Sequence, residues 1–149
     1  MKRFKFKLDA LLKLREFNEK QRKLELGQIL QEITQVKEKI LKIEEDIKET
    51  YLAQDDFMSS PAAGHMLQFF PFFIKGKKEE IKNCEALLYS LHKKYETKSK
   101  ELAIARGEVK VLENLKEKHH GKFKKELIKE ENQRLEEYVM IKRHREKHL

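Results

Sequence analysis

Cysteine, proline, glycine and tryptophan are scarce in this chain, and each shortage narrows the folds and activities open to it. Among 149 residues there are one Cys, two Pro, five Gly and no Trp. Because Cys84 has no possible partner within the chain, no internal disulfide forms and nothing points to an oxidising compartment. The glycines are scattered singly, so no glycine-rich loop is present to wrap a phosphate, and nucleotide hydrolysis by this chain is not expected.

Long apolar runs are also missing. The longest nearly apolar stretch, residues 69–74 (Phe-Phe-Pro-Phe-Phe-Ile), is far too short to span a bilayer. Residues 1–7 are basic enough to open a signal peptide, but Asp9, Lys13 and Arg15 interrupt the apolar stretch that should follow. We therefore expect a soluble protein of the cytoplasm.

Charge, by contrast, is abundant. Charged residues make up 40% of the sequence and hydrophobic residues 39%, and the formal net charge is +8. This composition is typical of long exposed helices with a narrow apolar seam, which leave little room to enclose a substrate pocket. His144 and His148 lie four residues apart, but no carboxylate or thiol completes a metal-ligand set with them. We expect one domain over 1–149, not an enzyme, with no catalytic, cofactor-binding or metal-binding residues.

Two stretches of the sequence repeat apolar residues at alternating spacings of three and four, the pattern of a helix that pairs with another helix. The first contains Leu26, Ile29, Ile33, Val36, Ile40, Ile43 and Ile47, and the second contains Ile81, Cys84, Leu88, Leu91, Tyr95, Lys98, Leu102, Ala105, Val109 and Leu112. We predict an all-α fold in which two long helices, about 4–58 and 67–147, form an antiparallel coiled-coil hairpin around a break at 59–66. Pairing between different chains stays an alternative, because heptads do not distinguish folding back from dimerisation.

A break centred near residue 66 sets the expected register of the two arms. It pairs Ile47 with Cys84, Ile40 with Leu91, Ile33 with Lys98, Leu26 with Ala105 and Leu8 with Phe123. Residues after about Leu127 then have no counterpart on the first arm. The second helix should therefore project alone by roughly 30 Å, at 1.5 Å for each residue.

The base of the hairpin, where the two chain ends meet, has charges at seam positions in this register. They are Arg15, Glu19 and Arg22 on the first arm and Lys116 and His119 on the second. Such charges predict a loosely held base unless a partner neutralises them. A local shift of register would instead use the apolar residues Leu14, Phe17 and Leu24.

Four phenylalanines lie in the five residues 69–73 around Pro71, next to the expected turn. A turn that only reverses the chain has little core in which to bury them. Two arrangements are open: the rings fold back over Tyr51, Phe57 and Ile81, or they form an exposed apolar patch for a protein partner. Pro71 could also bend the second arm without ending it.

The positive charge is concentrated in the second arm. Residues 81–149 hold eighteen Lys or Arg against twelve Asp or Glu, whereas residues 1–58 hold thirteen against twelve. The densest basic stretch, 142–148, could bind an acidic protein surface, nucleic acid or anionic lipid, or be a solvated helix terminus. A nucleic-acid-binding arm is therefore an alternative function, although the aromatic cluster lies away from the basic end.

The layout of the chain resembles a known family. The residues that carry the resemblance are the opening pattern Phe4-x-Phe6-x-Leu8-x-x-Leu11-Leu12-x-x-Arg15-Glu16 and the Phe73-Ile74 element that leads to Ile81. Together with the two Lys/Glu-rich helices they resemble FliJ, the small coiled-coil component of the bacterial flagellar type III export apparatus. The extra phenylalanines of 69–73 depart from the family's pattern.

This resemblance implies a stalk and adaptor, similar to the central subunit of rotary ATPases. It would link the export ATPase ring to the membrane export gate and escort export chaperones. The implied gate contacts are Ile47, Tyr51, Phe73 and Ile74. The implied ATPase contacts are Phe4, Phe6, Leu8, Leu11, Leu12, Leu135, Tyr138 and Ile141.

Further expectations concern the state and place of the protein. We expect a monomer when the protein is free, with no cofactor and no small-molecule substrate, located peripherally at the cytoplasmic face of the inner membrane. The equivalent stalk of a virulence type III secretion system is an alternative that the sequence hardly separates from the flagellar one.

Overall fold

The computed structural model describes residues 2–59, 64 and 66–148. It contains two long helices, α1 (Asp9–Met58) and α2 (Phe69–Lys147), of 50 and 79 residues. A short 3-10 turn, Met66–Gln68, precedes α2, and the described residues contain no strand. The all-α class predicted from the sequence is confirmed. Most of the predicted break at 59–66 lies outside the described residues.

Helix α1 begins at Asp9, so the prediction that it begins near residue 4 is wrong. The backbone N–H of Asp9 donates a hydrogen bond to the carbonyl of Phe6 (3.1 Å), which turns the chain just before the helix. Lys5 and Lys7 would place positive charge at the helix N-terminus, where the macrodipole favours a negative charge such as that of Asp9. The helix therefore does not continue back past Asp9: Lys7 and Leu8 form a turn, and residues 2–6 have no regular secondary structure.

Helix α2 begins at Phe69, close to the predicted start near residue 67. Pro71 is consequently its third residue. In the first turn of a helix the N–H groups have no intrahelical acceptor, so the missing N–H of proline costs no hydrogen bond there. The predicted option of a bend at Pro71 does not arise, because only two helical residues precede it.

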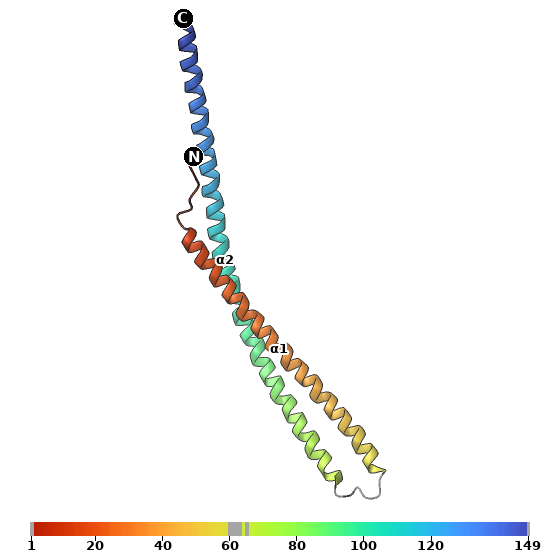
Figure 1. Cartoon of the computed structure of the whole chain (residues 1–149). Coiled ribbons are helices and arrows are strands. Elements are labelled where there is room, and N and C mark those ends of the chain that lie inside the picture. The colour runs from red at the N-terminus through yellow and green to blue at the C-terminus, as the bar shows by residue number, and fades with distance from the viewer. Residues whose placement is uncertain (1, 60–63, 65, 149) are drawn as a thin grey trace. The chain divides into compact units, whose positions relative to one another are not determined.

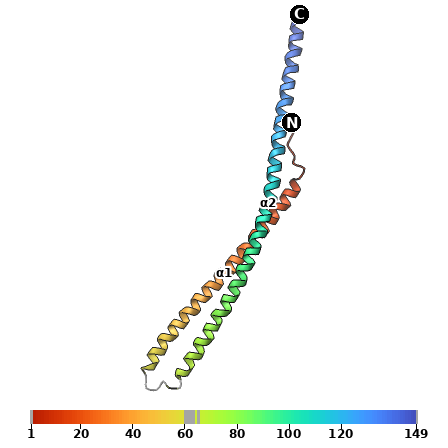
Figure 2. The ribbon, with the colours of Figure 1, turned by 180° about the vertical axis from the view of Figure 1, so that it is seen from behind.

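The chain divides into two compact units, which we call the turn unit (Gln21–Ala103) and the terminal unit (Met1–Lys20 with Ile104–Leu149). In the turn unit α1 and α2 lie side by side and run antiparallel on either side of the turn (Figure 1, Figure 2). Its core contains Ile29, Ile33, Val36, Ile43, Cys84 and Leu91, with Ile40, Ile47, Ile81, Leu88 and Tyr95 packed against it. The predicted helical hairpin is confirmed.

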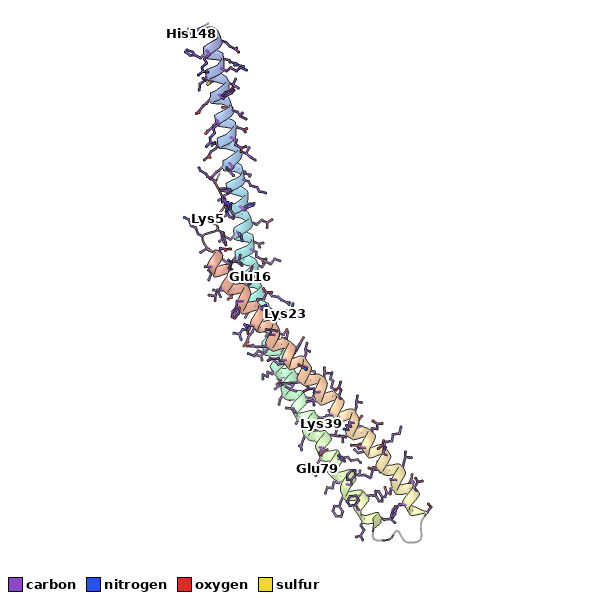
Figure 3. The ribbon with its side chains drawn as sticks, viewed as in Figure 1. Lys5, Glu16, Lys23, Lys39, Glu79 and His148 are labelled. Atoms are coloured by element: carbon purple, nitrogen blue, oxygen red, sulfur yellow. The ribbon has the colours of Figure 1, made fainter. Side chains whose placement is uncertain are left out.

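In the terminal unit, the start of the chain packs against the middle of α2. Its core contains Phe6, Leu12, Val109 and Leu112, and Phe4 and Leu115 pack against this cluster. The side chains of residues 131–148 are all exposed, and this part of α2 carries them into solvent as far as His148 (Figure 3). Both units are built from the same two helices, so the single domain over 1–149 stays a prediction.

Cross-helix ion pairs show the register within each unit. In the turn unit the pairs are Glu25–Lys98 (3.3 Å), Arg22–Glu101 (3.1 Å) and Asp46–Lys77 (3.9 Å). In the terminal unit they include Asp9–Lys116 (3.3 Å), Arg15–Glu108 (2.6 Å) and Glu19–Arg106 (3.6 Å). In each case the partner on α2 lies about seven residues, or one heptad, before the predicted one. The predicted register is therefore wrong.

A shift of one helix against the other by one heptad cannot be recognised from the sequence, because it keeps the same apolar positions in the seam. What decides the register is the position of the turn. Helix α1 ends at Met58 and α2 begins at Phe69, so the turn is centred a few residues before residue 66. When the centre of the turn moves along the chain by a given number of residues, the α2 residue that faces each α1 residue changes by twice that number.

The charges of the predicted loose base neutralise one another within the chain. Arg15 and Glu19 pair with Glu108 and Arg106 in the terminal unit, and Arg22 pairs with Glu101 in the turn unit. The apolar residues that a local shift would have used, Leu14, Phe17 and Leu24, are exposed. The alternative of a local shift is therefore wrong, and no outside partner is needed to satisfy these charges.

Candidate partner-binding surfaces

The phenylalanines near the turn are partly packed and partly exposed. Phe70 is half-buried and packs edge to face against Phe57 of α1, with ring centroids 5.9 Å apart. Phe69 and Phe72 keep 63% and 76% of their surface accessible. Each of the two predicted arrangements therefore holds for some of the rings. We call the exposed apolar area formed by Phe69, Phe72 and Phe73 the tip surface.

Phe73 is held in a defined orientation by its neighbours. Its ring stacks on that of Phe69 at a centroid distance of 5.9 Å, and the Lys77 ammonium lies 5.4 Å from its centroid. Lys77 is in turn paired with Asp46 of α1 at 3.9 Å. The tip surface is thus supported by a cation–π contact and an ion pair between the two helices.

The structure does not place the four predicted gate residues on one surface. Ile74 is only 7% exposed, and Ile47 packs against the core of the turn unit. Tyr51 is 45% exposed and lines a groove together with Ile74. Phe73 lines a separate groove with Phe69 and Phe70. Tyr51 and Phe73 remain accessible to a partner, whereas Ile47 packs into the core and Ile74 is buried except for the surface that it contributes to the groove.

The predicted ATPase residues at the start of the chain divide in a similar way. Phe6 and Leu12 are buried in the core of the terminal unit, and Phe4 is half-buried. Leu8 and Leu11 are exposed. Phe123, predicted to lie opposite Leu8, contacts Phe4 instead, at a ring distance of 5.6 Å. Only Leu8 and Leu11 of this group offer their side chains to a partner.

Two histidines help to hold the start of the chain on α2. Phe4 lies edge to face against His120 at 4.9 Å, and Phe6 lies similarly against His119 at 5.8 Å. The Lys2 ammonium pairs with Glu130 at 3.2 Å. Figure 3 shows Lys5 in this segment, beside α2. The opening pattern of the sequence therefore acts first as an internal packing element.

The part of α2 after residue 130, which we call the tail, carries the other predicted ATPase residues. Leu135, Tyr138 and Ile141 are all exposed. A shallow groove lies along the same part of the helix, lined by Leu135, Glu136, Val139, Met140 and Arg143. Every described side chain of the tail is exposed, and none of them belongs to the core of the terminal unit.

Among the described residues, the ion pairs shift the pKa values of three groups. The hydrogen bond that Lys98 donates to Glu25 lowers the pKa of Glu25, and the hydrogen bond that Lys116 donates to Asp9 lowers the pKa of Asp9. The pKa of Lys98 is raised by hydrogen bonds first to Glu101 and then to Glu25. Each shift favours the charged form because a partner of opposite charge lies within reach.

These shifts predict a stability that is flat near neutral pH and falls at both extremes. A lowered carboxyl pKa contributes stability above about pH 4, and this is lost as the pH falls through the folded-state values. The raised pKa of Lys98 contributes below about pH 10, and this is lost as the pH rises through its folded-state value. Thermal unfolding followed by circular dichroism across this range measures the effect.

The variant Lys98→Gln is the matched control for this prediction. It removes the ammonium charge whose hydrogen bond and attraction lower the pKa of Glu25, so we expect the Glu25 carboxyl to titrate at higher pH in an NMR titration of the carboxyl carbons. Asp9, which is paired with Lys116, should titrate as before. An unchanged Glu25 titration would show that the pair does not set its pKa.

Some residues of the exposed surfaces were missed by the analysis of the sequence. Lys75, Lys78 and Lys82 line the groove beside Tyr51. Their spacing of three and four residues places them on one side of α2 and could have identified them. The tail groove adds Val139 and Met140 to the predicted contact residues of the tail; Val139 lies on the same weak apolar stripe of the sequence as Leu135, Tyr138 and Ile141.

Other kinds of site find no support in the described residues. Within them, no three His, Cys, Asp or Glu side chains gather closely enough to hold a metal ion. His144 and His148 do lie together, with ring centroids 4.4 Å apart, but they are only two. Among the same residues, no helix has a stretch that is both long and apolar enough to cross a membrane.

Comparisons with known proteins identify the family to which this chain belongs. Residues 4–148 match the family model described as FliJ, the flagellar FliJ protein. Searches of curated proteins and of solved structures find no match to the chain. The matched residues include the opening pattern, both helices and the tail, which is nearly the whole sequence. The chain therefore belongs to the FliJ family, a non-enzymatic flagellar family related to protein export.

Proposed function

We propose that this protein is a stalk and adaptor of the flagellar type III export apparatus, which links the export ATPase ring to the membrane export gate. The observation that carries the proposal is that exposed apolar side chains form two surfaces, and that these surfaces belong to different units. The tip surface lies in the turn unit, and Leu135, Tyr138 and Ile141 lie on the tail of the terminal unit.

The assignment of partners follows from the family and from accessibility. We assign the gate contact to Phe73 and Tyr51, which are exposed, with Ile47 and Ile74 supporting them from within. We assign the ATPase contact to Leu8 and Leu11 and to the tail, with Phe4, Phe6 and Leu12 holding the segment in place. The protein would then work at the cytoplasmic face of the inner membrane, without catalytic activity of its own.

We also propose that the protein escorts export chaperones, and this part of the proposal is supported only by membership of the family. No described surface is assigned to a chaperone. The flagellar description of the matched family favours the flagellar apparatus over its virulence counterpart.

A binding experiment tests the proposal. The purified protein should bind the export ATPase and raise its hydrolysis rate, and alone it should hydrolyse no ATP. Phe73→Ala should weaken capture of the cytoplasmic part of the gate protein while leaving the ATPase response intact. Absence of ATPase binding even at low salt would reject the stalk, and tight, salt-sensitive binding to DNA in its place would favour a nucleic-acid-binding arm.

A further inference from the structure

The groove beside Tyr51 has an apolar floor. It has a volume of about 510 Å³ and lies between the end of α1 and the beginning of α2 in the turn unit. Ile74, which is 7% exposed, contributes apolar surface together with Pro71 and Tyr51. A space of this kind accepts an apolar side chain from a partner.

The rim of this groove is positively charged. Lys75, Lys78 and Lys82 line it from α2, against a single carboxylate, that of Glu79. Among the ion pairs of the described residues, none involves Lys75, Lys78 or Lys82. These ammonium groups are therefore available to a ligand, and they leave a positive surplus around an apolar floor.

The groove that contains the tip phenylalanines has the opposite charge. It is lined by Asp46 and Glu49 of α1 together with Phe69, Phe70 and Phe73. Lys77, whose ammonium lies over the Phe73 ring, is paired with Asp46, so the remaining negative charge of this groove is that of Glu49. The two grooves use different residues of both helices, so a partner that approaches the turn meets a basic side and an acidic side.

We propose that the Tyr51 groove binds a segment of a partner protein in which an apolar side chain is flanked by Asp or Glu residues. The apolar side chain would occupy the floor over Ile74, and the flanking carboxylates would pair with Lys75, Lys78 and Lys82. Charge complementarity of this kind selects the partner and its orientation more than it adds affinity. Taking that segment to be part of the export gate rests on the proposed function above.

A labelled peptide tests the inference without the gate. The probe is a short peptide with Leu-Phe at its centre and Glu on both sides, and its match carries Gln in place of every Glu. Fluorescence anisotropy should show saturable binding of the Glu peptide that weakens as salt rises, and binding of the Gln peptide that is about tenfold weaker.

Charge reversal in the protein provides the matched variants. The triple variant Lys75→Glu, Lys78→Glu, Lys82→Glu should lose about tenfold in affinity for the Glu peptide and gain affinity for a Lys-flanked one. The control Lys39→Glu, Lys94→Glu, Lys100→Glu changes the net charge equally at exposed positions of the same unit and should keep the wild-type affinity. Lys39 and Glu79 mark the two helices of this unit in Figure 3.

The outcomes separate the inference from the proposed function. Equal binding of the Glu and Gln peptides, an equal loss in both triple variants, or stronger binding of single-stranded DNA than of the Glu peptide would overturn the inference. Circular dichroism confirms that the variants are folded. If the peptide fails to bind while the wild-type protein still captures the gate through Phe73, the inference falls and the proposed function stands.

Discussion

Oxidation of the variant Ile40→Cys is expected to join the new thiol to Cys84 in a disulfide within one chain. Cys84 is the only native cysteine and is buried in the core of the turn unit, and Ile40 packs against the same core. The pairs Glu25–Lys98 and Asp46–Lys77 on either side bring residues 39 and 40 to the level of residue 84. The product should run faster than the reduced protein on a denaturing gel.

The disulfide should also raise stability by a large amount. Joining residues 40 and 84 closes a long loop in the unfolded chain, which corresponds to about 4 kcal/mol of stabilisation in the chain-entropy treatment. Thermal unfolding of the oxidised and reduced forms of the same variant measures the difference. Because the two forms share the substitution, the cost of replacing Ile40 cancels.

The matched control is Ile47→Cys. The register expected from the sequence places residue 47 opposite Cys84, whereas the structure displaces it along the helix by about one heptad, roughly 10 Å. A disulfide cannot span that displacement without movement of the backbone. Efficient bridging in Ile47→Cys and none in Ile40→Cys would contradict the register of the structure. A linked species of twice the mass would favour pairing between chains.

The regular part of the fold could be predicted because one physical pattern dominates it. Apolar side chains at spacings of three and four must be buried along one side of each helix, and residues such as Ile29, Ile33 and Leu91 are buried. The register could not be predicted in the same way. Every heptad offers the same apolar positions, and only the turn and the ion pairs, such as that of Glu25 with Lys98, distinguish one alignment from the next.

The candidate surfaces could be predicted less well, because apolar residues near a chain end can be core or contact. Phe6 and Leu12 belong to the opening pattern of the family, yet they are buried against α2. The sequence shows that Phe6 is apolar but not that His119 lies against it. The tail was easier to identify, since a helix without a counterpart must expose residues such as Leu135.

Deletion of residues 131–149 should abolish stimulation of the export ATPase and leave the rest of the protein folded. Every side chain from 131 to 148 is exposed, so the deletion removes no packing from the core around Phe6 and Leu112. We expect a thermal unfolding curve close to that of the full chain. Binding should weaken by about tenfold to a hundredfold, as expected when apolar anchors at the centre of an interface are lost.

Point variants distinguish a specific contact from the loss of basic charge. Leu135→Ala with Tyr138→Ala keeps every charge of the tail and should reproduce most of the loss of ATPase binding and stimulation. The matched control is Ile104→Ala with Val111→Ala, which truncates two equally exposed apolar side chains elsewhere on α2 of the terminal unit and should bind normally.

If the deletion removes binding but the Leu135 and Tyr138 variant does not, the basic residues 142–148 carry the contact. Steep weakening by salt would then accompany it, because charge pairing at an exposed surface is screened within about 10 Å at moderate ionic strength. Full stimulation by the deleted protein would show that the tail is not the ATPase contact. Of the residues assigned to this contact, Leu8 and Leu11 would then be the exposed ones left to bind the ATPase.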